Sequence, residues 1–343
     1  MPLRDEILEQ PAVLAKLLAN QRGKLEEIAG AVGRPEAIFI AARGTSDNAA
    51  RYAKYIWGGR NRIPVSLAAP SLFSVYHTPP KLDGLLVVGI SQSGESPDLL
   101  AVIKEGNLQG CRTLAITNDL SSPLAGEADH VIDITAGPEL SIAATKTYTA
   151  QLAAIAMLSA AWQNDDRAMD QISRIPDLIS QVLELERDIS RYASRYRYMD
   201  QCVVLGRGFN YATAYEWSLK MKELAYVVAQ PYSSADFLHG PIAVISSGFP
   251  VFAIAPKGKV FQELSGLIKR LKDNHQADLF LISDSNVLLR LGDCPVRLPG
   301  GIPEWLSPLV TIVPAQLLSY HLTVVKGFDP DSPRGLKKVT RTQ

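Results

Sequence analysis

A short segment near residue 91 concentrates the side chains that most readily bind a small anion. The apolar run Leu85–Ile90 predicts a buried strand, and the loop Ser91-Gln92-Ser93-Gly94-Glu95-Ser96 follows it. Ser96, Pro97 and Asp98 then have the order of a helix start, namely an N-cap, a first position and an acidic first turn. Because a helix N-terminus presents unpaired N–H groups and a partial positive charge, the loop suits a phosphate held by neutral donors. A polar strand-to-helix turn without a ligand is the alternative at this point.

Further groups with acid–base chemistry lie in the second half of the chain. Lys220 and Glu223 are three residues apart, so on a helix they share one face. His239 precedes a Gly-Pro pair, and Lys338 lies in the turn-rich, basic segment 331–340. Each has a simple structural alternative: an exposed ion pair, a structural histidine and a solvated chain end. Taken singly, none of them assigns a function.

Strand-like and helix-like segments alternate along the chain and must position these groups. The expected strands are residues 37–42, 65–68, 85–90, 112–117, 131–135, 202–205, 251–255 and 279–283, with helices over 5–31, 48–57 and 261–275 among others. Such alternation predicts parallel sheets covered by helices on both faces. Arg43-Gly44 and Arg207-Gly208 close a strand in each half, which indicates a duplicated α/β unit. Ligands of open α/β sheets bind at the carboxyl ends of strands, where Thr45, Ser46 and the Ser91 loop are expected.

Composition limits the class of protein. The 343 residues contain 47% hydrophobic and 20% charged side chains, which is typical of a well-packed globular enzyme with two domains. With 35 basic and 35 acidic residues the formal net charge is zero, so neither nucleic acid nor a membrane is an expected partner. Three cysteines without metal-type spacing indicate a cytoplasmic location and no metal site. The apolar stretches 150–162 and 306–325 carry polar interruptions, and residues 1–9 lack a signal-peptide core, so a soluble protein is expected.

Several motifs in fixed order resemble the sugar isomerase (SIS) family over almost the whole chain. They are Thr45-Ser46 after a glycine, the Ser91–Ser96 loop, Glu139–Lys146, Lys220–Glu223, His239-Gly240-Pro241, the tail Pro333–Lys338 and an opening Glu9-Gln10-Pro11. The resemblance is to the isomerase half of glucosamine-6-phosphate synthase and to stand-alone glucosamine-6-phosphate deaminases. It implies two tandem SIS subdomains of α/β type, each a mostly parallel sheet flanked by helices. The implied segments are 1–165 with a leading helix, a helical connector over 166–200, and 201–343 with a C-terminal active-site tail.

The resemblance also implies roles for individual side chains. Glu223 would move a proton between C1 and C2 of the open-chain sugar, His239 would assist ring opening from a second subunit, and Lys338 would lie at the sugar. The phosphate contacts fall to Thr45, Ser46, Ser91, Gln92, Ser93 and Ser96. The substrate-binding set also includes Gly44, Ile142 and Lys220, which matches a further active-site lysine. The resemblance implies no metal or other cofactor, and it implies a homodimer with shared active sites. Ala144 in place of a serine and Asp236 in place of a glutamate depart from the family pattern, which leaves the exact substrate open.

The start of the chain indicates a direction for the reaction. The synthase begins with a glutaminase domain, and this sequence starts directly at Met1-Pro2-Leu3 without one. We therefore expect conversion of glucosamine 6-phosphate to fructose 6-phosphate and ammonia by C1–C2 proton transfer. The alternatives are a deglycase acting on fructosamine-type 6-phosphates, a glutaminase-lacking isomerase relative of the synthase, and a non-catalytic sugar-phosphate sensor. The sensor is disfavoured because the acid–base groups are retained.

Overall fold

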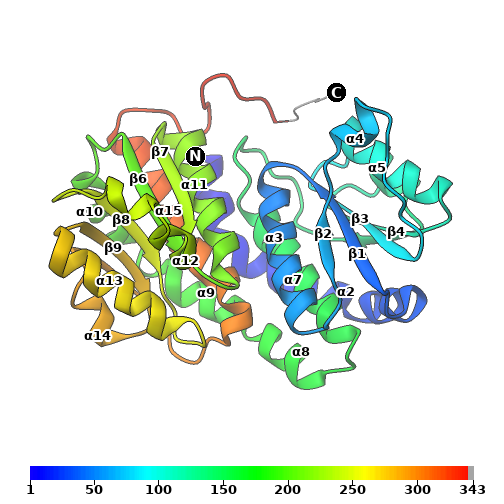
Figure 1. Ribbon diagram of the computed structural model, residues 1–343, viewed down its shortest axis with the longest axis horizontal. Helices are drawn as coiled ribbons and strands as arrows, with labels where there is room; N and C mark the ends of the chain where they lie inside the picture. The colour runs from blue at the N-terminus through cyan, green and yellow to red at the C-terminus, as the bar shows by residue number, and fades with distance from the viewer. Residues whose placement is uncertain (339–343) are drawn as a thin grey trace. The chain divides into compact units, whose positions relative to one another are not determined.

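Two five-stranded parallel sheets form the framework of the computed structural model, which describes residues 1–338 (Figure 1). Val339 and Thr340 of the predicted tail lie outside the described residues, as does the end of the predicted segment 201–343. The chain divides into two units. Unit 1 comprises residues 1–8, 141–143 and 177–336, and unit 2 comprises residues 9–140, 144–176 and 337–338 of the described chain. The predicted segment boundaries at residues 165 and 200 stay a prediction.

The sheet of unit 2 has the order β2-β1-β3-β4-β5, and all neighbouring strands are parallel. Its strands are β1 (Ala37–Ala42), β2 (Val65–Leu67), β3 (Leu85–Ser91), β4 (Arg112–Thr117) and β5 (His130–Asp133). The register places Ile38 of β1 opposite Leu86 of β3. The central strands are apolar on both faces, as parallel strands covered by helices require.

Two helices of unit 2, α3 (Gly44–Gly59) and α5 (Pro97–Leu108), begin at the candidate phosphate-binding segments. The other helices of this unit are α2 (Gln10–Val32), α4 (Ser71–Ser74), α6 (Pro123–Glu127), α7 (Lys146–Ala161) and α8 (Asp166–Ser173). Helix α7 packs against α2 and α3. Helix α3 begins at Gly44 and not at Asn48 as predicted. Arg43 is still extended, and Gly44 adopts a φ of 54°, so the chain turns from strand into helix without an intervening loop.

The sheet of unit 1 repeats the same strand order as β7-β6-β8-β9-β10. Its strands are β6 (Gln201–Gly206), β7 (Val228–Ser233), β8 (Pro250–Ile254), β9 (Asp278–Ser283) and β10 (Cys294–Arg297). Its helices are α1 (Pro2–Leu8), α9 (Ile175–Leu183), α10 (Glu186–Arg195), α11 (Asn210–Ala225), α12 (Ser234–Leu238), α13 (Phe261–His275), α14 (Asn286–Leu289) and α15 (Ser307–Val325), with 3-10 turns η1 (Pro241–Val244) and η2 (Glu304–Leu306). In both sheets the first strand lies between the second and the third. The predicted α/β class with two tandem, parallel-sheet subdomains is therefore confirmed.

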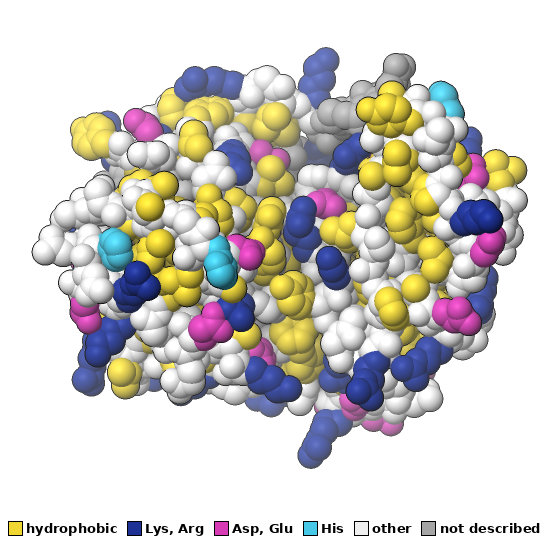
Figure 2. Space-filling model, in the orientation of Figure 1, with side chains coloured by type: hydrophobic (Ala, Val, Ile, Leu, Met, Phe, Trp, Pro, Cys, Tyr) yellow, Lys and Arg dark blue, Asp and Glu magenta, His cyan; other side chains and the backbone are white. Residues whose placement is uncertain are grey.

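One segment of the described chain, residues 304–325, is long and apolar enough to cross a membrane. In the structure, 83% of its most apolar window is buried. Its helix α15 packs against α10 and α11 within unit 1, so the segment is a core helix, as its polar interruptions predict. On the face drawn in Figure 2, basic and acidic side chains are interspersed, in keeping with the net charge of zero.

Candidate active site

The serine loop joins the carboxyl end of β3 to the first turn of α5. Ser96 is the extended N-cap of α5, as the sequence predicts, but its hydroxyl makes no capping hydrogen bond. The Ser91 hydroxyl accepts a hydrogen bond from the Gly94 N–H (3.0 Å), and the Ser93 hydroxyl accepts one from the Glu95 N–H (3.4 Å). Because these two hydroxyls accept from the loop, their own O–H groups can donate to a bound anion.

Gly94 fixes the shape of this loop. Its φ of 64° lies in the left-handed region that favours glycine. A Cβ atom at this position would lie 2.2 Å from Oγ of Ser122 and 3.2 Å from Cβ of Leu124. The Gly94 carbonyl also accepts a hydrogen bond from the Leu124 N–H at 3.1 Å. The loop therefore rests directly on the start of α6, which holds its hydroxyls in place.

A second set of donors lies at the carboxyl end of β1, the strand next to β3. Thr45 and Ser46 belong to the first turn of α3, and the Ser46 hydroxyl accepts a hydrogen bond from Gln151 Nε2 at 3.0 Å. The strand order changes direction between β1 and β3, and ligands of doubly wound sheets bind at such a switch point. The structure thus brings together, within unit 2, Gly44, Thr45, Ser46, Ser91, Gln92, Ser93 and Ser96.

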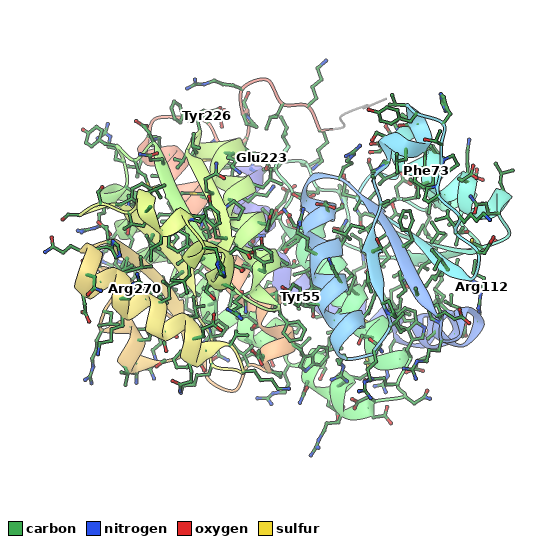
Figure 3. All side chains as sticks on the ribbon, in the orientation of Figure 1. Tyr55, Phe73, Arg112, Glu223, Tyr226 and Arg270 are labelled. Carbon is green, nitrogen blue, oxygen red and sulfur yellow. The ribbon has the colours of Figure 1, made fainter. Side chains whose placement is uncertain are left out.

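Three charged side chains on α11 form an acid–base cluster in unit 1; Figure 3 labels Glu223, the member nearest the end of that helix. The Lys220 ammonium lies 2.6 Å from Glu223 Oε2 and 3.3 Å from Glu216 Oε1. Burial alone would lower the pKa of Lys220, but the two carboxylates outweigh burial, so the pKa is raised and the ammonium stays charged. Glu216 is fully buried, whereas 23% of the Glu223 side chain is exposed. Glu223 is therefore the carboxylate of this cluster that is accessible from solvent.

The packing of α11 explains the burial of this cluster. The helix packs against α15, β6 and β7 within unit 1, and Glu216 and Lys220 share the covered face. The alternative of an exposed ion pair between Lys220 and Glu223 is therefore wrong, because only 1% of the lysine side chain is exposed. Glu216 was not predicted as a site residue. Its position one turn before Lys220 was the available signal.

His239 is the C-cap residue of helix α12 and is exposed in unit 1. The N-cap Ser233 accepts a hydrogen bond from the Asp236 N–H (3.2 Å) and donates one to the Asp236 carboxylate (3.0 Å). The aspartate that replaces the glutamate of the family pattern therefore completes the cap of the helix that carries His239. Within residues 1–338, no hydrogen bond or ion pair joins His239 to the α11 cluster.

Lys338 lies beside a buried carboxylate of unit 2. Its Nζ is 3.5 Å from Oε2 of Glu139, whose side chain is fully buried. Glu139 also accepts hydrogen bonds from the N–H groups of Thr145 (2.9 Å) and Thr147 (3.2 Å) and from the Thr147 hydroxyl (2.6 Å). Glu139 therefore caps the N-terminus of α7, where the helix dipole stabilises its charge. The motif 139–146 contained this residue, but its role as the partner of Lys338 was not predicted.

The predicted site residues thus fall into separate sets. Apart from Lys220 and Ile142, the substrate- and phosphate-binding candidates belong to unit 2, as does Lys338, whereas Lys220, Glu223 and His239 belong to unit 1. Ile142, half-buried in the segment 141–143, also belongs to unit 1. The chemical role of each of these side chains stays a prediction.

The duplicated sheet and the serine loop at its switch point define a class of protein. A family model described as the SIS domain matches residues 34–161 and again residues 197–326. The chain therefore belongs to the SIS domain family. Among curated proteins, the "glutamine--fructose-6-phosphate aminotransferase [isomerizing]" of Methanothermobacter thermautotrophicus is 37% identical over 337 residues, which are 97% of this chain and 56% of that protein. The chain thus spans about half the length of the curated relatives it matches.

Solved structures agree with this assignment. The C-terminal domain of glucosamine-fructose-6-phosphate aminotransferase from Francisella tularensis has 29% sequence identity and a TM-score of 0.87, over 97% of this chain and 98% of that one. The glucosamine-6-phosphate deaminase of Thermotoga maritima has a TM-score of 0.80 over the whole of both chains, and at 24% identity this likeness concerns the fold alone. The family and the aminotransferase relatives support a sugar-phosphate isomerase function.

Proposed function

We propose that this protein is an amino-sugar phosphate deaminase that converts glucosamine 6-phosphate and water to fructose 6-phosphate and ammonia. The observation that carries the proposal is the α11 cluster, in which Glu223 is partly exposed and held 2.6 Å from a buried ammonium. A carboxylate held in this way is suited to take a proton from a carbon next to a carbonyl group. The SIS family match supports a sugar phosphate as the substrate class.

The proposed reaction begins with binding of the substrate phosphate by the serine loop and the first turn of α3. His239 moves the proton of the C1 hydroxyl to the ring oxygen, which opens the ring and leaves an aldehyde at C1. Glu223 removes the C2 proton and returns it to C1, while O1 gains a proton and the nitrogen loses one, which gives the 2-imine of fructose 6-phosphate. Water adds to the imine carbon, and ammonia leaves. The Lys338 ammonium stabilises the negative charge that develops on O1 during the proton transfer.

Further parts of the proposal are a homodimer, a cytoplasmic location and a contribution of His239 to the active site of the second subunit. In support, His239 lies among exposed apolar side chains, with Leu238 40% and Val244 57% exposed. Mixing E223Q protein with H239A protein should then restore part of the activity through hybrid dimers. Confirmed exchange of subunits without any regained activity would contradict sharing of the site.

A second candidate function is aldose–ketose isomerisation without deamination. It is favoured by the 37% identity to a glutamine-dependent aminotransferase named as isomerizing. Such an enzyme would interconvert hexose 6-phosphates through the same Glu223 but release no ammonia from glucosamine 6-phosphate. A deglycase would instead release the amine of a fructosamine-type 6-phosphate, and a sensor would bind sugar phosphate without turnover.

The test is ammonia release from glucosamine 6-phosphate in the absence of glutamine, with fructose 6-phosphate measured in parallel. We expect equal amounts of the two products from the native protein. E223Q should lower kcat by at least about 100-fold, because it removes the proton acceptor while keeping the shape of the side chain. The matched control is E27Q, which changes an exposed glutamate of α2 and should leave the rate unchanged. Full activity of E223Q would exclude the proposed mechanism, and absence of ammonia from the native protein would exclude the deaminase.

A further inference from the structure

An arginine–aspartate pair joins the two turns assigned to the phosphate. Arg43 is the N-cap of α3 and immediately precedes the Gly44–Ser46 turn. Asp98 lies in the first turn of α5, two residues after the serine loop. The Arg43 Nε donates to Asp98 Oδ2 at 2.6 Å. This ion pair therefore places a guanidinium at the switch point between β1 and β3, where only neutral donors were predicted.

The pair fixes one edge of the guanidinium and leaves the other edge open. Asp98 is fully buried, and its Oδ1 accepts a hydrogen bond from the Leu99 N–H (3.0 Å), so the carboxylate is held in place. Half of the Arg43 side chain (51%) is exposed. Within residues 1–338, Nε is the nitrogen of Arg43 that makes a hydrogen bond, and the two terminal NH2 groups have no partner. Two terminal NH2 groups side by side match two oxygens of a phosphate.

Unit 1 contains a counterpart of this pair that is used differently. Arg207 follows β6 as Arg43 follows β1, and it pairs with Glu263 in the first turn of α13. Here the terminal nitrogen Nη1 contacts both Glu263 and the hydroxyl of Ser234. One of the two terminal nitrogens of this guanidinium is therefore occupied by the protein itself. In unit 2, by contrast, both terminal NH2 groups of the corresponding arginine are open.

We propose that the terminal NH2 groups of Arg43 bind the phosphate of the substrate, with Asp98 as the residue that orients them. The inference rests on the proposed function, since it adds a cation to the phosphate site assigned there. It explains how a site otherwise built of hydroxyl and N–H donors can favour a dianionic phosphate ester over a neutral sugar. Arg43, Lys220 and Lys338 are each paired with a carboxylate, but the negative charge of Asp98 is offset further by the N-terminus of α5, in whose first turn it lies.

The test is calorimetric titration with fructose 6-phosphate, with fructose as the ligand that lacks the phosphate. R43M should raise the Kd for fructose 6-phosphate by about 10- to 100-fold, the range expected for loss of a charge-assisted pair of hydrogen bonds. R43K should give an intermediate Kd because an ammonium keeps the charge but not the planar pair of donors. The increase of Kd with salt should be smaller for R43M than for the native protein. The matched control R207M should change the Kd by less than about twofold, since Arg207 follows β6 in unit 1 and is not part of the phosphate site proposed in unit 2.

The outcomes separate this inference from the proposed function. R43M leaves a buried aspartate without its partner, so R43M/D98N, which removes both charges, is measured as well and must show the same loss of affinity. If the native protein binds fructose 6-phosphate and both Arg43 variants bind it equally well, Arg43 is not a phosphate ligand and the deaminase proposal stands. If R207M weakens binding as much as R43M does, the effect is structural and the inference is wrong. If the native protein binds no hexose 6-phosphate, the proposed function fails and the inference fails with it.

Discussion

Among the left-handed glycines of unit 2, Gly94 is the one whose replacement by alanine should lower the stability most. The backbone contributes first, because alanine at a φ of 64° costs about 1–2 kcal/mol. The contact contributes next, because the new Cβ would lie 2.2 Å from Oγ and 2.5 Å from Cβ of Ser122. Overpacking of this kind costs about 1–3 kcal/mol. Ser122 caps α6 by accepting from the Ala125 N–H and cannot move without weakening that cap.

The total for G94A is therefore about 2–5 kcal/mol, and it is accompanied by displacement of the Ser91 and Ser93 hydroxyls. The matched control is G137A, because Gly137 has a φ of 67° and no atom within 4 Å of an added Cβ. G137A should lose only the backbone part, about 1–2 kcal/mol. Urea unfolding followed by circular dichroism gives the stability difference, and titration with fructose 6-phosphate gives the effect on binding. Equal stability and equal affinity of the two variants would refute the argument that the loop is held by its contact with Ser122.

Two further predictions concern buried charges in unit 1. K220M leaves the fully buried Glu216 without the Lys220 cation and should lower the free energy of unfolding by about 3–5 kcal/mol. The double variant K220M/E216Q should recover much of this loss. Urea unfolding at pH 7 measures both variants, and equal stability of the two would contradict this account. Burial lowers the pKa of His321 below its ordinary 6.5 despite the neighbouring Glu186, so the unfolded chain binds the proton more readily. Stability should therefore fall as the pH drops below about 7. In H321Q, the unfolding temperature should fall less steeply between about pH 7 and 5. An unchanged pH dependence in H321Q would show that His321 is not the cause.

The sequence predicted the central strands of both sheets well but missed two strands at their edges. Apolar runs buried on both faces, such as β1, are the strongest local signal, and that strand was predicted with its observed bounds. The strands β7 and β10 were not predicted. Each lies at a sheet edge and contains a proline, Pro231 or Pro295, which weakens a strand pattern and is tolerated only where one side of the strand has no neighbour.

For the candidate site, the sequence identified the motifs but not the burial and the ionic partners of their charged side chains. Ser96 as the N-cap of α5 was readable because Ser-Pro-Asp is a local signal. The burial of Lys220 was not, since it depends on the packing of α11 against α15, which lies far along the chain. The pairs of Lys338 with Glu139 and of Arg43 with Asp98 likewise join residues distant in sequence. Local patterns carry no information about such partners.

Unit 1 is built from segments far apart in the chain, and this has a consequence for folding during synthesis. Its first segment, residues 1–8, is synthesised before all of unit 2, but its partners come much later. Arg4 forms its ion pair with Glu186, and the Leu3 N–H donates to Asp331, which is 328 residues further along. At about 5–20 residues per second, the interval between synthesis of this segment and synthesis of its last partners is on the order of tens of seconds. Leu3 and Ile7, both fully buried in the folded protein, lack their partners on α15 during that interval, so the nascent chain presents two apolar side chains to chaperones until the last helix of unit 1 has been translated.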